Sequence, residues 1–147
     1  MHEAIHRALR AAHSFAWQQR HEYVTVEHLL MMVCRDIGEN SNWQYAGQVE
    51  DDLNAYIAAN NPTLCGEAIK LLGCTATVGL KRVVSRMKEL LRQEEVIGSE
   101  AFMLMLLAFC VEKNSFAAYA LHKHGASQAL QKYFRSRRGR ERHAKAN

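Results

Sequence analysis

Several features that define common protein classes are scarce or missing in this sequence of 147 residues. One proline and eight glycines are too few for a β-sandwich or a linker-rich protein. The longest apolar run, residues 101–111, is too short to span a bilayer, and no secretory signal is recognisable. The four cysteines lack close paired spacing and have mostly apolar neighbours, so we expect free, buried thiols in a reducing cytoplasm.

Motifs for catalysis are missing as well. None of the glycines is followed by lysine, which excludes a phosphate-binding loop of the GxxxxGK[ST] type. Ser14, Ser85 and Ser115 do not lie in the strand–turn–helix pattern of a serine nucleophile. We therefore expect a non-catalytic protein without a cofactor, and any ATPase motor must lie on another polypeptide or on another part of a longer one.

The net charge of +4 is unevenly distributed along the chain. From Arg135 onward, six Arg or Lys residues accompany a single Glu, so this segment carries +5 and residues 1–134 carry about −1. We expect residues 136–147 to form a basic, flexible tail. Such a tail can bind nucleic acid, which is one alternative function, but no aromatic residue beyond Phe134 offers a surface for base stacking.

What the sequence does contain is a helical periodicity that occurs twice. The first apolar set is Ile5, Ala8, Leu9, Ala12 and Ala16, and the second, shifted by 75 residues, is Leu80, Val83, Val84, Met87 and Leu91. Each amphipathic segment leads through a charged turn, at 19–23 or 93–95, into an apolar helix. The pattern predicts an all-α fold: a pseudo-twofold, duplicated four-helix repeat that forms a single helical bundle, without strands.

Local signals set the bounds of the repeats at about 3–60 and 77–135, with a connector at 61–76. A third helix, centred on Leu53, ends at the Asn-Asn-Pro sequence of residues 60–62, because the residue before a proline is disfavoured in helical conformation. Apolar residues 68–72 predict one helical turn in the connector. The helix at 115–123 should stop at Gly125, and Ser127 should cap a last helix that ends near Phe134.

Residues 21–32 read His-Glu-Tyr-Val-Thr-Val-Glu-His-Leu-Leu-Met-Met. Thr25 can cap the helix that follows, and Glu27 lies in its first turn, where a carboxylate favours the helix dipole. The apolar run that follows predicts a helix buried on most sides. Two His and two Glu suggest a metal site, but their spacing is not HExxH, so we interpret His21 and His28 as surface or capping groups.

The motif of residues 21–30 resembles the signature of the Clp amino-terminal domain, specifically that of the ClpA type of AAA+ unfoldase, the partner of the ClpP peptidase. The second repeat agrees at residues 80–84, 95–96 and 117–124, and the resemblance covers roughly residues 3–136. It implies a monomeric, cytoplasmic domain that docks substrate proteins and a ClpS-type adaptor onto an unfoldase ring. Trp43 and Tyr45 depart from the family pattern.

The resemblance also implies an adaptor-binding site. Glu22 and Glu27 match acidic positions that contact the adaptor, while Thr77 and Arg82 match positions at the start of the second repeat. We expect all four on exposed helix starts, where opposite charges on neighbouring surfaces would orient a partner. A free-standing protein that competes for the adaptor would use the same surface and is the other alternative function.

Overall fold

The structure, a computed structural model, describes residues 2–40, 43–65, 67–68, 70, 73–92 and 99–146, without the side chains of residues 40, 99 and 137–146. The helices are α1 (Glu3–Gln18), α2 (Val26–Asn40), α3 (Ala46–Asn60), α5 (Val78–Arg92), α6 (Ser99–Val111), α7 (Phe116–Lys123) and α8 (Ala126–Ala146), and the strands are β1 (Tyr23–Val24) and β2 (Thr75–Ala76). The all-α prediction is confirmed.

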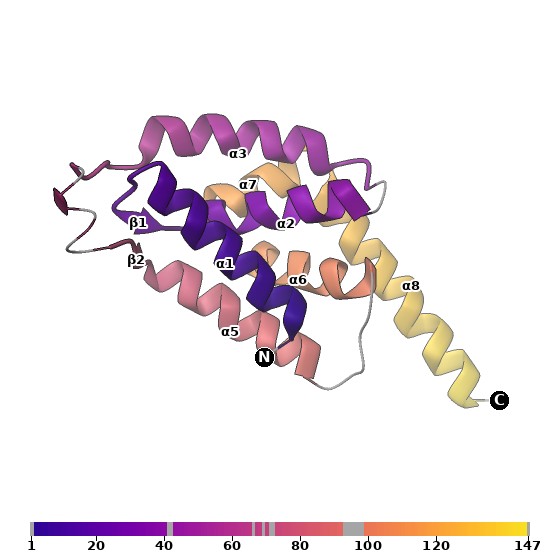
Figure 1. Cartoon of the computed structure of the whole chain (residues 1–147). Coiled ribbons are helices and arrows are strands. Elements are labelled where there is room, and N and C mark those ends of the chain that lie inside the picture. The colour runs from indigo at the N-terminus through magenta and orange to yellow at the C-terminus, as the bar shows by residue number, and fades with distance from the viewer. Residues whose placement is uncertain are drawn as a thin grey trace.

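The helices are arranged around α2 and α6, which pack against each other in the middle of the bundle. In Figure 1, α1 crosses α2 while α5 runs along α6, and α3 and α7 pack on the other sides of these central helices. The order of neighbours in α1–α2–α3 is thus the same as in α5–α6–α7. The third helix of each series differs in length: α3 has 15 residues and α7 has eight.

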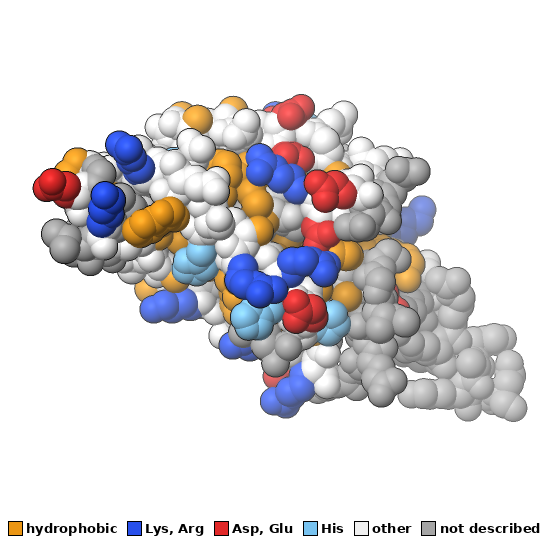
Figure 2. Space-filling model, viewed as in Figure 1, with side chains coloured by type: hydrophobic (Ala, Val, Ile, Leu, Met, Phe, Trp, Pro, Cys, Tyr) orange, Lys and Arg blue, Asp and Glu red, His pale blue; other side chains and the backbone are white. Residues whose placement is uncertain are grey.

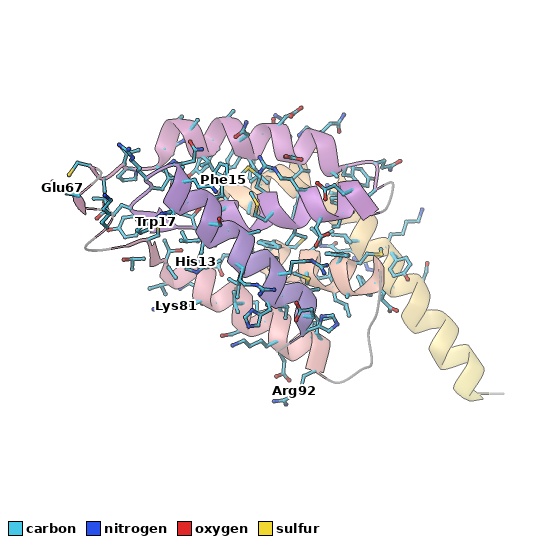
Figure 3. The ribbon with its side chains drawn as sticks, viewed as in Figure 1. His13, Phe15, Trp17, Glu67, Lys81 and Arg92 are labelled. Carbon is cyan, nitrogen blue, oxygen red and sulfur yellow. The ribbon has the colours of Figure 1, made fainter. Side chains whose placement is uncertain are left out.

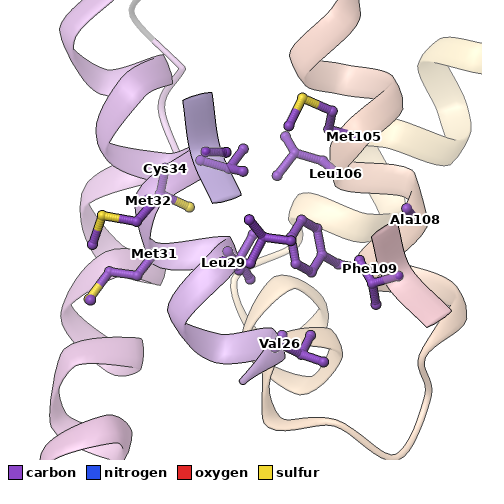
Figure 4. Packing of buried hydrophobic residues seen from close by; sticks show 14 of the residues in the cluster. Val26, Leu29, Met31, Met32, Cys34, Met105, Leu106, Ala108 and Phe109 are labelled. Atoms are coloured by element: carbon purple, nitrogen blue, oxygen red, sulfur yellow. The ribbon is translucent and has the colours of Figure 1, made fainter. Parts of the chain in front are cut away.

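The core is formed mainly by the two apolar helices. Leu29 and Leu30 of α2 and Leu106 and Phe109 of α6 are completely buried. Figure 4 shows the apolar side chains of the two helices facing one another within one cluster. Because α6 is apolar on all sides, it can contact α2, α5, α7 and α8 at once. The predicted burial of α2 on most sides is confirmed.

The amphipathic helices bury the faces that their periodicity indicates. Most members of the two predicted apolar sets are buried: Ile5, Ala8, Ala12 and Ala16 of α1, and Leu80, Val83, Met87 and Leu91 of α5. The two remaining members, Leu9 and Val84, are partly buried. Alanine at four of the five buried positions of α1 lets its backbone come close to α2.

Helix ends agree with some of the local signals and contradict others. Asn61 is extended after α3, and Gly125 has φ +81° after α7, as predicted. Ser127 is not a cap, because it lies inside the first turn of α8 and its Oγ donates to Gln128 Oε1 over 3.0 Å.

The predicted end of the last helix at Phe134 is also wrong. The segment beyond it is rich in good helix formers and lacks proline, and α8 continues to Ala146, projecting from the bundle in Figure 1.

The prediction that strands are absent is wrong on a small scale. β1 and β2 pair in parallel, with Tyr23 opposite Thr75 and Val24 opposite Ala76. Residues 71–72, part of the predicted connector helix, and the predicted turn at 93–95 lie outside the described residues. Within the described part of the chain, no single helix is long and apolar enough to cross a membrane. Residues 100–111 and 116–123 meet that criterion only as a pair bent by 115°.

All four cysteines are free thiols, but they are not equally buried. Cys34 is buried, and burial raises the pKa of its thiol to about 12. Cys74 and Cys110 are half-buried, whereas Cys65 is exposed. The expectation of four buried thiols is therefore wrong for Cys65, which lies in the connector rather than on a helix face that packs against the core.

Candidate protein-docking site

The candidate site begins where α1 ends. The N–H of His21 donates to the carbonyl of Ala16 over 2.9 Å, and the N–H of Arg20 donates to that of Trp17 over 3.0 Å. These two bonds form a Schellman motif, which needs a left-handed residue at Arg20. Arg20 indeed has φ +59°, an unusual value for a residue with a side chain. The motif reverses the chain and directs His21 into the protein.

Residues 20–24 are then held on both sides by parts of the connector. On one side, Glu22 N–H donates to Pro62 O over 2.9 Å, and Leu64 N–H donates to Arg20 O over 2.8 Å. On the other side, Thr75 N–H donates to Glu22 O over 3.0 Å, and Thr77 N–H donates to Val24 O over 3.1 Å. We call this three-stranded arrangement of residues 20–24, 62–64 and 75–77 the joint.

His21 of the joint forms a buried pair with His28 of α2. His21 Nδ1 and His28 Nε2 are 2.8 Å apart, and both rings lie close to Phe15. The N–H of Thr25 donates to His28 Nδ1 over 3.0 Å, so this nitrogen must be an acceptor without a proton. His28 therefore carries its proton on Nε2 and donates it to His21 Nδ1. The interpretation of these histidines as surface groups is wrong.

Both histidines are held in their neutral form. Burial lowers the pKa of His21, and burial together with the neighbouring His21 lowers the pKa of His28 to about 4. A proton added to His28 Nδ1 would face the Thr25 N–H, and one added to His21 Nδ1 would face the His28 N–H. Across the described residues, no group of three or more His, Cys, Asp or Glu side chains is placed to hold a metal ion.

Thr25 and Thr77 have the same role at the two helices that leave the joint. Thr25 Oγ1 accepts from the His28 N–H over 3.3 Å, as the sequence predicts, and Thr77 Oγ1 accepts from the Leu80 N–H over 3.2 Å. Each hydroxyl therefore caps the first turn of its helix, α2 or α5. The strand pairing aligns these two capped helix starts side by side.

Glu27 does not lie on the exposed surface where we expected it. It is buried, and its Oε2 accepts the backbone N–H of Ala117 over 3.3 Å, in the first turn of α7. Ser115 Oγ accepts the N–H of Ala118 in the same turn, so two side chains together cap α7. Burial raises the pKa of Glu27, and the Ala117 N–H partly opposes that shift. The packing of α2 against α7 turns its side chain inward.

Arg82 is exposed but not isolated. Its guanidinium forms two bonds to Glu112 Oε1, from Nη2 over 2.8 Å and from Nε over 3.1 Å, and Arg86 Nη1 binds Glu112 Oε2 over 2.7 Å. The two arginines lower the pKa of the Glu112 carboxyl. Two cations share one carboxylate, so the group keeps a net positive charge, and Arg82 is held in a fixed position on α5.

Three exposed apolar side chains next to the joint were missed by the sequence analysis. Trp17 is 46% exposed, Tyr23 is 38% exposed and Val78 is 67% exposed. Trp17 falls one position after Ala16, outside the apolar stripe of α1, so the periodicity itself could have identified it. Figure 3 shows Trp17 at the strand end of the bundle, and Figure 2 shows apolar surface there beside cationic side chains.

The joint thus gathers most of the predicted site residues at one end of the molecule. Glu22 precedes β1, Thr77 follows β2, and Arg82 lies on the second turn of α5. We call Trp17, Glu22, Tyr23, Thr77, Val78 and Arg82 the β1–β2 surface. Glu27 is excluded from it by its burial under α7.

Compared with known protein families and with curated proteins, the sequence matches none.

Glu27 should contribute to stability rather than to a surface. Replacing Glu27 with Ala leaves the buried Ala117 N–H without an acceptor, so we expect a loss of about 1–3 kcal/mol in the free energy of unfolding, measured by urea denaturation. Glu27→Gln keeps an acceptor oxygen and removes a buried charge, so it should lose less than Glu27→Ala. Glu39→Ala, an exposed change on the same helix, is the control and should change stability by no more than about 0.5 kcal/mol. Equal stability of Glu27→Ala and wild type would refute the capping role.

The histidine pair should make the fold sensitive to acid. Because the pKa of both rings is lower in the folded than in the unfolded chain, the unfolded chain binds protons first as the pH falls below about 6.5. Stability should be constant above that pH and should fall by about 1–2 kcal/mol by pH 5. His28→Gln should reduce this dependence, whereas His13→Gln, at an exposed position, should leave it unchanged. Urea denaturation at pH 7.5 and pH 5 measures the free energy of unfolding of each variant. If His28→Gln loses as much stability between these two pH values as wild type does, the buried histidine pair is not the cause of the acid sensitivity.

Proposed function

We propose that this chain is a non-catalytic protein-docking domain of the Clp amino-terminal type. Its β1–β2 surface binds a ClpS-type adaptor, and through it brings substrate proteins to an AAA+ unfoldase of an ATP-dependent protease. The observation that carries this proposal is the pairing of β1 with β2. That pairing brings two distant segments, around 22 and around 77, next to each other, and the surface beside them carries both charged and apolar side chains.

The composition of the β1–β2 surface fits a protein partner. Trp, Tyr and Arg are the residue types that most often dominate binding energy at protein interfaces. Here Trp17 and Tyr23 offer exposed rings, while Glu22 and Arg82 offer charges of opposite sign. Apolar contacts would supply most of the affinity, and the charges would orient the partner and raise the association rate.

The joint also fixes this surface before any partner arrives. Its backbone hydrogen bonds tie residues 20–24 to residues 62–64 on one side and to residues 75–77 on the other, and the Glu112 carboxylate holds Arg82. A surface that is already ordered loses less conformational entropy on binding. The matching order of neighbours in α1–α2–α3 and α5–α6–α7 supports the duplicated repeat that the resemblance implies. We propose a monomeric domain in the cytoplasm.

Docking should be weakened by changes on the β1–β2 surface and not by matched changes elsewhere. Trp17→Ala, Glu22→Ala and Arg82→Ala should each weaken binding of a ClpS-type adaptor about 30-fold, because truncating a well-buried interface group costs about 2 kcal/mol or more. Isothermal titration calorimetry measures the affinity, and urea denaturation checks that each variant remains folded.

Matched controls are Tyr133→Ala, Glu39→Ala and Arg10→Ala, which remove the same kinds of group from exposed positions on α8, α2 and α1. These should bind like wild type. If the triple variant of Trp17, Glu22 and Arg82 binds as tightly as wild type, the docking surface is wrong. If the wild-type chain does not bind the adaptor at all, the proposed partner is wrong.

A further inference from the structure

A cavity of about 330 Å³ lies where α7 and α8 meet the end of α6. Lys113 lines it from the turn between α6 and α7. Tyr119 and His122 line it from α7, and Ser127 and Gln131 line it from α8. The Lys113, Tyr119, His122 and Gln131 side chains can each donate a hydrogen bond to a ligand, whereas the Ser127 hydroxyl donates to Gln128 Oε1. The described lining includes no carboxylate.

The positive charge of this cavity is not neutralised by nearby acids. Glu112, next to Lys113 in the sequence, is paired with Arg82 and Arg86 instead. None of the ion pairs between described residues involves Lys113 or His122. The Lys113 ammonium group therefore remains available to an anion in the cavity.

The hydrogen bonds around His122 determine which of its nitrogens carries the proton. The side-chain N–H of Gln128 donates to His122 Nδ1 over 3.1 Å. The Gln128 side chain is oriented in turn by Ser127, whose Oγ donates to Gln128 Oε1 over 3.0 Å. Since His122 Nδ1 is an acceptor, its proton lies on Nε2. The ring is thus fixed as an N–H donor on the side away from Gln128.

Other groups at the cavity do not introduce negative charge. Burial raises the pKa of Cys110 to about 11, so its thiol is neutral, and it donates to Leu106 O. The carbonyls at the end of α6 already have donors. Val111 O accepts the N–H of Lys113 over 3.0 Å, and Glu112 O accepts both the N–H and the Oγ–H of Ser115.

We propose that this cavity binds a phosphate group, either as free phosphate or as the phosphorylated side chain of a bound protein. A phosphate offers several oxygens to the Lys113 ammonium, the His122 N–H and the Gln131 amide, and hydrogen bonds to ionised groups are the strong ones. The first turn of α8, which contains Ser127, adds the positive end of a helix dipole. The volume is at the lower limit for small-ligand sites and exceeds what one water needs. The site uses none of the residues of the β1–β2 surface, so it does not depend on the function proposed above.

Titration of the full chain with three probes, followed by ¹H–¹⁵N NMR, tests the proposal. The probes are inorganic phosphate, capped phosphoserine (N-acetyl, N-methylamide) and the same capped serine without phosphate. We expect saturable shifts of the backbone amides around Lys113 and Ser127 with both phosphorylated probes and none with capped serine. Lys113→Gln should weaken binding about tenfold or more. Lys132→Gln, which removes the same charge from an exposed position of α8 outside the cavity, should not.

The two phosphate probes distinguish the source of the ligand. Tighter binding of capped phosphoserine would indicate a phosphorylated protein, and equal binding would indicate free phosphate. The proposal is overturned if Lys113→Gln binds both probes like wild type. It is also overturned if the shifts occur only in residues 135–147, which would mean that the basic end of α8 is the anion-binding segment.

Discussion

The rest of this structure depends on the joint, where residues 20–24 are hydrogen-bonded to residues 62–64 on one side and 75–77 on the other. The joint follows α1, precedes α2 and α5, and carries both ends of the connector. His21 and Val24 are buried within it, and buried backbone groups need hydrogen-bond partners. Two very short strands satisfy these groups and at the same time fix how the first and second halves of the bundle meet.

Buried polar residues at the joint and at the start of α2 are hydrogen-bonded to one another and to backbone N–H groups. His21 and His28 share one hydrogen bond, Thr25 fixes the tautomer of His28, and Glu27 caps a helix from the other half of the chain. Buried polar groups cost little when each has a partner and much when one partner is lost. The motif at residues 21–28 therefore fixes the start of α2, and Glu27 links that start to α7 in the second half of the chain.

Much of the fold could be predicted from periodicity, because the burial of an apolar helix face and the end of a helix are determined by residues close together in the sequence. The apolar stripes of α1 and α5 and the continuous apolar surface of α6 have only one way to be buried, and Gly125 and Pro62 mark helix ends by their own backbone preferences. The candidate site was predicted only in part. Spacing cannot tell that Arg20 adopts a left-handed conformation, that two histidines seven residues apart face each other, or that Glu27 points at α7, since each depends on packing between distant segments.

The central claim is that backbone pairing at the joint holds the docking surface in place, and hydrogen exchange of the Thr75 and Thr77 amides tests it most directly. These amides donate to Glu22 O and Val24 O, so their exchange should be slowed by a factor of about 100 or more, as for amides within α2 such as that of Leu29. Exchange of Thr75 and Thr77 at the rate of an unstructured peptide, while Leu29 remains protected, would contradict the account, because the two strands would then not be joined in solution.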